Sequence, residues 1–116
     1  MLGMNKLQAN LILAQAKHET GNFTSDLFKK QNNAFGMGEP HARISTDLDI
    51  NETGFAEYSS LELSVIDLIL WYKATQFRWN LISTPSDYAR ELKFHNYYED
   101  SIANYEKGLE YFYNKA

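Results

Sequence analysis

One glutamate in the chain is placed where acid catalysis could use it. Glu19 closes an apolar run that starts at Leu11, and Gly21 and an asparagine-rich loop follow. Apolar residues recur at helical spacing before it, so we expect a helix over residues 5–18, ended by Gly21. A carboxylic acid at the edge of a groove can protonate a glycosidic oxygen. The alternative is an exposed glutamate that opposes the helix dipole by about 0.3 kcal/mol or more.

The loop that follows Glu19 contains a second group of candidate residues, Asn32, Asn33, Phe35 and Gly36. By composition alone, paired asparagines before an aromatic residue and a glycine predict a turn. Gly36 would also allow another group to approach the backbone closely. These four residues are therefore either a plain loop or part of a binding groove.

The elements that must position these residues are mainly helical. Residues 42–58 alternate apolar and polar side chains around the sequence NETG, which predicts a small β-hairpin. Serine, threonine and proline at helix-starting positions predict four further helices. The first is a short helix over residues 25–30, capped by Thr24 or Ser25, and the second is a long helix capped by Ser59 that reaches about Arg78. The third is capped by Thr84 and reaches about Lys93, and the last begins at Asp100 or Ser101. We expect a single domain over residues 1–116, mainly α (α+β), with one small β-lobe.

The bulk composition excludes several classes of function. The net charge of −4 argues against a nucleic-acid partner. The absence of cysteine excludes disulfides and thiolate metal sites, and no run of 18 apolar residues predicts membrane insertion. The three histidines show no HExxH spacing, so we expect neither a metal nor another cofactor.

These motifs, in this order, resemble the bacterial and phage glucosaminidase family, glycoside hydrolase family 73, of the lysozyme-like superfamily. The family pattern AQAxxESGxGxS is followed by NNxFG, and this chain reads AQAKHETGNFTS and then NNAFG. FAEYSSLELSVIDLI is similar to the family's FRxYxSxxESxxDxxxxL, with Phe55, Tyr58 and Asp67 in register, and NYYEDSIANYEKGL more loosely resembles GYATDPxYxxxL. The resemblance implies a lysozyme-like helical domain with a small β-hairpin lobe.

The resemblance also implies roles for individual residues. Glu19 matches the catalytic acid, which requires a pKa raised by partial burial. A tyrosine that faces this acid and hydrogen-bonds substrate or water corresponds to Tyr97, with Tyr98 as the alternative. The substrate-binding positions, with the aromatic ring packed under the loop, correspond to Asn32, Asn33, Phe35, Gly36 and Tyr58.

The second carboxylate departs from the family pattern. The family has T-x-E in the β-lobe, whereas this chain offers Asp47, with Asp49 as the alternative. Both could instead belong to the solvated face of a hairpin. Other groups could position the water, or the substrate's N-acetyl group could act as the nucleophile.

The sequence therefore predicts a peptidoglycan hydrolase that cleaves β-1,4 bonds between N-acetylated amino sugars of the bacterial cell wall. The alternative is a non-catalytic structural or glycan-binding domain that keeps the fold, for example in a phage virion. The N-terminal residues MLGMNKLQAN do not form a signal peptide. We thus expect a cell-wall location, periplasmic or extracellular, reached as a phage-encoded protein or as part of a larger protein or virion.

Overall fold

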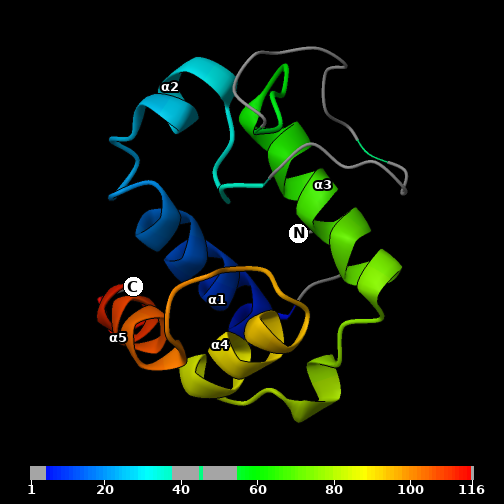
Figure 1. The fold of residues 1–116 in the computed structure, drawn as a ribbon, viewed down its shortest axis with the longest axis vertical. Helices are drawn as coiled ribbons and strands as arrows, with labels where there is room; N and C mark the ends of the chain where they lie inside the picture. Colours follow the sequence, from blue (N-terminus) through cyan, green and yellow to red (C-terminus); the bar gives the residue numbers. More distant parts are fainter. Residues whose placement is uncertain (1–4, 38–44, 46–54, 116) are drawn as a thin grey trace. The chain divides into compact units, whose positions relative to one another are not determined.

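The computed structural model describes residues 5–37, 45 and 55–115. Its helices are α1 (Lys6–Glu19), α2 (Asp26–Gln31), α3 (Leu61–Thr75), the 3-10 turn η1 (Trp79–Leu81), α4 (Pro85–Phe94) and α5 (Ile102–Tyr113) (Figure 1). The prediction of a mainly α protein is confirmed for this part of the chain. None of these helices has the length and apolar character needed to cross a membrane.

The chain divides into two compact units. The first unit joins Met1–His18 to Phe77–Ala116, and the second is Glu19–Gln76. One boundary falls between the last two residues of α1, and the other follows α3.

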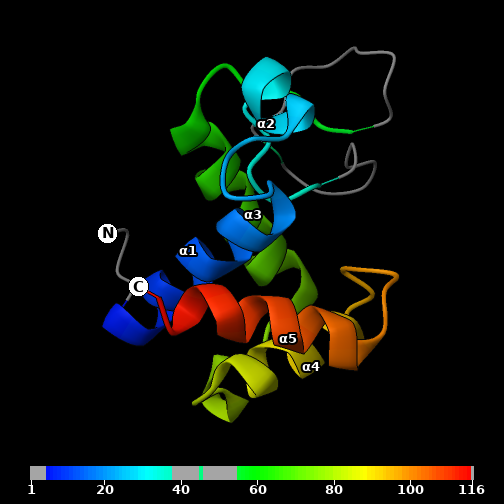
Figure 2. The same cartoon turned by 90° about the vertical axis from the view of Figure 1, so that its left-hand side faces the viewer.

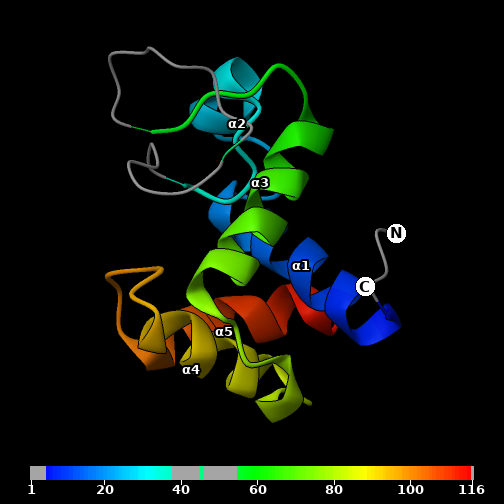
Figure 3. The same ribbon diagram turned by 90° about the vertical axis from the view of Figure 1, so that its right-hand side faces the viewer.

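The first unit is built around the packing of α4 on α5, which lie side by side in Figures 2 and 3. Leu92 of α4 and Tyr105 and Leu109 of α5 are buried. Tyr88 of α4 donates a hydrogen bond to Gln15 of α1, at 2.5 Å between Oη and Oε1. This bond lies in the interior, so it joins α1 to α4 by a polar contact within an apolar core.

In the second unit, the chain after α2 pairs with the chain before α3. The backbone N–H of Tyr58 donates to the carbonyl of Gln31 at 2.9 Å, and that of Ala56 donates to Met37 at 2.8 Å. Side chains add further bonds between these two segments. Residues 31–37 and 55–58 therefore form one hydrogen-bonded layer within this unit.

The helix ends follow the predicted caps with one correction. Ser25, Thr84 and Ser101 cap α2, α4 and α5 through their side-chain oxygens, as their types and positions indicate. The prediction that Ser59 caps the long helix was wrong: Ser60 does so, and its Oγ accepts from the Leu63 N–H at 3.3 Å.

The end of the long helix also differs from the prediction. α3 ends at Thr75, three residues before the predicted Arg78, because Gln76 adopts a left-handed conformation with φ of 56°. The predicted hairpin over residues 42–58 lies mostly outside the described residues. Within it, Ser45 and residues 55–58 are described, and Phe55 makes a single bridge.

Candidate active site

Glu19 is the last residue of α1, and its carboxylate lies against the backbone of Gly36. A Cβ on Gly36 would lie 3.3 Å from Oε2 and 3.8 Å from Cδ of Glu19. Gly36 has φ of +65°, a conformation that suits glycine far better than other residues. The glycine thus gives the carboxylate space that any other residue would partly occupy. Glu19 itself is half-buried.

The turn after Glu19 is tight and conformationally unusual. Gly21, Asn22 and Phe23 follow one another with φ of 58°, 61° and 67°. The buried Thr20 holds this turn, since its Oγ1 accepts from the Phe23 N–H at 2.7 Å and its carbonyl accepts from Thr24 and Ser25, each at 2.9 Å. Left-handed conformation costs about 1–2 kcal/mol for a residue with a side chain, so this turn concentrates strain beside Glu19.

Asn33 holds the loop that carries Gly36. Its buried amide donates to the carbonyls of Met37 and Ala56, both at 2.9 Å. Its Oδ1 accepts from the N–H of Phe35 at 3.3 Å and of Met37 at 3.2 Å. The side chain therefore satisfies donors and acceptors around the bend at Gly36 and fixes the loop backbone.

The neighbouring loop residues also have internal partners. Asn32 ends α2 with φ of 54°, and its amide donates to the Tyr58 carbonyl at 2.9 Å. The Ala34 N–H donates to Ser64 Oγ of α3 at 3.3 Å. Phe35 is 1% exposed, so its ring packs under the loop.

Tyr58 connects this layer to a buried carboxylate on α3. Its hydroxyl donates to Oδ2 of Asp67, which is 0% exposed, and lies 4.0 Å from the Met37 sulfur. Ser45 Oγ donates to the other oxygen of Asp67 at 2.7 Å. Asp67 thus holds Tyr58 and Ser45 together.

The two tyrosines considered as partners of the acid differ in their contacts. Tyr98 donates its hydroxyl to the Ala89 carbonyl at 2.9 Å and stacks on Tyr105 with ring centroids 3.8 Å apart. Burial, together with nearby acidic side chains, raises the pKa of Tyr98 to about 12. Tyr98 is therefore engaged within its own unit. Tyr97 is half-buried, and its backbone N–H donates to Leu92 at 3.0 Å.

The second acid lies beyond what the structure describes. Asp47 and its alternative Asp49 both fall within residues 46–54, which are outside the described residues. Within the described ranges, no group of three or more histidine or acidic side chains is arranged to hold a metal ion.

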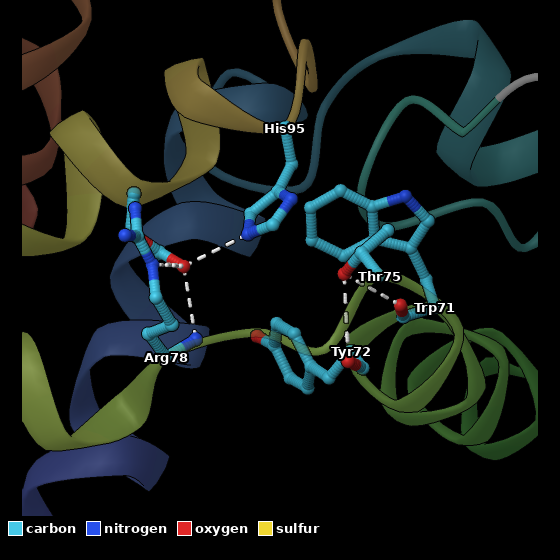
Figure 4. A network of polar contacts seen from close by, with 6 residues as sticks. Trp71, Tyr72, Thr75, Arg78 and His95 are labelled. Atoms are coloured by element: carbon cyan, nitrogen blue, oxygen red, sulfur yellow. Dashed lines mark hydrogen bonds and ion pairs between the residues drawn. The ribbon is translucent and has the colours of Figure 1, made fainter.

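A further polar cluster, which the sequence did not predict, joins α4 to the segment after α3 (Figure 4). Glu91 is 4% exposed and accepts from Nε and Nη2 of Arg78, at 3.1 and 2.8 Å, and from the Arg78 backbone N–H at 2.9 Å. His95 Nε2 lies 2.8 Å from the same carboxylate. Burial raises the pKa of Glu91, but the hydrogen bonds from Arg78 and His95 outweigh it and lower this pKa overall.

This cluster has a structural explanation. Glu91 is already bonded to a permanent cation and a histidine, so it is poorly placed to donate a proton. The four-residue spacing of Glu91 and His95 on a helix is the one signal that could have indicated their contact. Arg78 comes from outside α4, so nothing in the local pattern points to it.

The described residues are mainly helical, and they hold a half-buried carboxylate, that of Glu19, at the end of α1. One family model matches residues 3–115, and its description is mannosyl-glycoprotein endo-beta-N-acetylglucosaminidase. The chain belongs to this glucosaminidase family, glycoside hydrolase family 73. The family comprises glycoside hydrolases of the cell wall, and its substrate is peptidoglycan. Neither a curated protein nor a solved structure matches the chain.

Proposed function

We propose that this chain hydrolyses β-1,4 bonds between N-acetylated amino sugars of peptidoglycan, with Glu19 as the general acid. The observation that carries the proposal is the position of the Glu19 carboxylate against Gly36. Its Oε2 lies 3.3 Å from the point where a Cβ on Gly36 would be. Glu19 is the last residue of the helix α1, and its carboxylate faces a loop that Asn33 holds by four hydrogen bonds. Such fixed placement is what proton transfer to a leaving group requires.

In the proposed reaction, the Glu19 carboxyl gives its proton to the glycosidic oxygen as the bond from the anomeric carbon breaks. A water molecule then adds to that carbon and loses a proton to a second carboxylate, for which Asp47 is the candidate. The alternative route uses the substrate's N-acetyl oxygen as the nucleophile, and water opens the resulting ring. Tyr97 is the proposed hydrogen-bond partner of substrate or water.

We propose that Asn32, Asn33, Phe35, Gly36 and Tyr58 serve substrate binding mainly by shaping the groove. The buried Phe35 and Tyr58 support the loop from within, and the half-buried Gly36 is the position that would offer its backbone to a sugar. We also propose that the two compact units form one lysozyme-like domain, because a single family model spans both of them.

The location that we propose is the bacterial cell wall, in the periplasm or outside the cell. The net charge of −4 does not favour adhesion to an anionic wall. We therefore propose delivery as part of a larger protein or virion, which would supply the attraction to the wall.

The test is release of soluble fragments from purified peptidoglycan by the wild type, Glu19→Gln and Glu110→Gln. Glu110 lies on an exposed position of α5, so its change controls for the loss of one negative charge. We expect Glu19→Gln to lose at least ~100-fold of the release rate, the scale of general acid catalysis, while Glu110→Gln keeps it. Binding of the wild type to peptidoglycan without any release would instead favour the non-catalytic alternative.

A further inference from the structure

His18, the residue just before Glu19, packs into a notch that Gly108 leaves in the surface of α5. A Cβ on Gly108 would lie only 2.2 Å from both Cε1 and Nδ1 of His18, and 3.1 Å from its Cγ. These distances are far inside van der Waals contact, so the imidazole occupies the space that any side chain at position 108 would need. Gly108 lies within α5, where glycine is the least favourable residue apart from proline. The imidazole explains its presence there.

Tyr105 forms a second wall of the notch. Its ring meets the His18 ring edge-on, with centroids 4.7 Å apart and planes at 88°. Tyr105 is 2% exposed and stacks on Tyr98, so this wall is itself fixed. Tyr105 and Gly108 are three residues apart on α5 and share one face of the helix. The imidazole therefore has a rigid ring on one side and bare backbone on the other.

Burial lowers the pKa of His18, with Asp100 opposing the shift. The neutral imidazole is thus favoured in the notch at neutral pH, and its contacts there are those of packing.

We propose that His18 is a positioning residue for Glu19, and that the notch formed by Tyr105 and Gly108 is the device that fixes it. This inference rests on the proposed function of Glu19. His18 and Glu19 are consecutive in α1, so their side chains point in different directions and the coupling runs through the helix backbone. Holding the imidazole in the notch fixes the conformation of the last turn of α1, and the Glu19 side chain extends from that turn.

The experiment compares the wild type, Gly108→Ala, His18→Ala and the double variant, with Lys107→Ala as the control at a neighbouring exposed position of α5. The melting temperature, kcat and apparent KM are measured for each on soluble, uncross-linked peptidoglycan strands, well below the melting temperature. In Gly108→Ala, the methyl would lie 2.2 Å from the ring, so the ring must retreat by more than about 1 Å to regain ordinary van der Waals contact. Misplacement on this scale costs about 10–100-fold in kcat.

We expect Gly108→Ala to lower kcat about 10–100-fold with little change in KM, and Lys107→Ala to leave both unchanged. In the wild-type background Gly108→Ala lowers the melting temperature. In the His18→Ala background the same change raises it, because alanine then fills an empty notch and favours the helix. The double variant also recovers part of the kcat lost by His18→Ala.

An unchanged kcat in Gly108→Ala, or equal effects of Gly108→Ala in both backgrounds, would overturn the inference. A change in KM alone would also overturn it, since positioning of the acid acts on the chemical step. If the wild type itself shows no Glu19-dependent cleavage, the proposed function fails and the inference fails with it. A wild type with Glu19-dependent cleavage and no response to Gly108→Ala refutes the positioning role alone.

Discussion

The contact between Glu19 and Gly36 makes Gly36→Ala the most informative perturbation of the site. The left-handed conformation at φ of +65° costs an alanine about 1–2 kcal/mol. With about 2.1 cal/mol/K of unfolding entropy per residue, a chain of 116 residues loses about 4–8 °C of melting temperature for that cost. The new methyl would also lie 3.3 Å from Glu19 Oε2, so the carboxylate must shift by a few tenths of an ångström.

The effect on activity follows from this shift. Because a misplacement of about 1 Å can cost about 100-fold, a few tenths of an ångström should cost about 3–10-fold in the cleavage rate. Gly21→Ala is the matched control. It has φ of +58°, and its Cβ would lie 3.2 Å from Thr24 Oγ1, an exposed hydroxyl that donates to the Gly21 carbonyl at 2.7 Å. It therefore imposes a similar backbone cost without touching the acid.

The assay is fragment release from peptidoglycan at a temperature well below both melting points, with melting curves recorded in parallel. We expect both variants to lose similar stability, and Gly36→Ala to lose about 3–10-fold more activity than Gly21→Ala. Equal activity in the two variants would refute the argument that Gly36 makes room for the carboxylate.

Two further predictions concern stability. Asn33→Ala removes four hydrogen bonds from a buried loop, and at about 0.5–1 kcal/mol each we expect a loss of about 2–4 kcal/mol in the free energy of unfolding, measured by urea denaturation. A loss below about 1 kcal/mol would contradict the role of Asn33 in holding the loop. Glu91→Gln should lower the melting temperature at pH 7, because the charged carboxylate is the form that Arg78 and His95 bind. Since the pKa of Glu91 is lowered in the folded protein, this stabilisation is present above about pH 4.5 and is lost as the pH falls, so the difference from wild type should shrink in acid. A difference that stays constant from pH 7 to pH 3 would show that the pairing is not electrostatic.

The sequence predicted the elements whose signals are local. Gly21 and Thr84 act through a conformation and a cap within three residues of themselves, so their positions could be read from the chain. Ser25 and Ser101 were each one of two neighbouring candidates, and the structure selects between them. The choice between Ser59 and Ser60 could not, because either serine fits a cap and the surrounding packing selects one.

The sequence also identified two parts of the candidate site, Glu19 and the loop that contains Gly36. The exact contact between them depends on how Asn33 folds the loop back, through partners up to 23 residues away. The seat of His18 on Gly108 was not predictable for the same reason, because the two residues are 90 positions apart. A glycine within an otherwise regular helix indicates close packing but does not identify the neighbour.

The most direct test of the account is the identity of the sugar ends that the protein creates. Peptidoglycan is digested with the wild type and with Glu19→Gln, the products are reduced with borohydride, and the reduced ends are counted by mass spectrometry. We predict new reduced ends on one kind of N-acetylated amino sugar in the wild-type digest, and at least ~100-fold fewer with Glu19→Gln. Equal numbers of new ends in both digests, or none in either, would contradict the central role of Glu19.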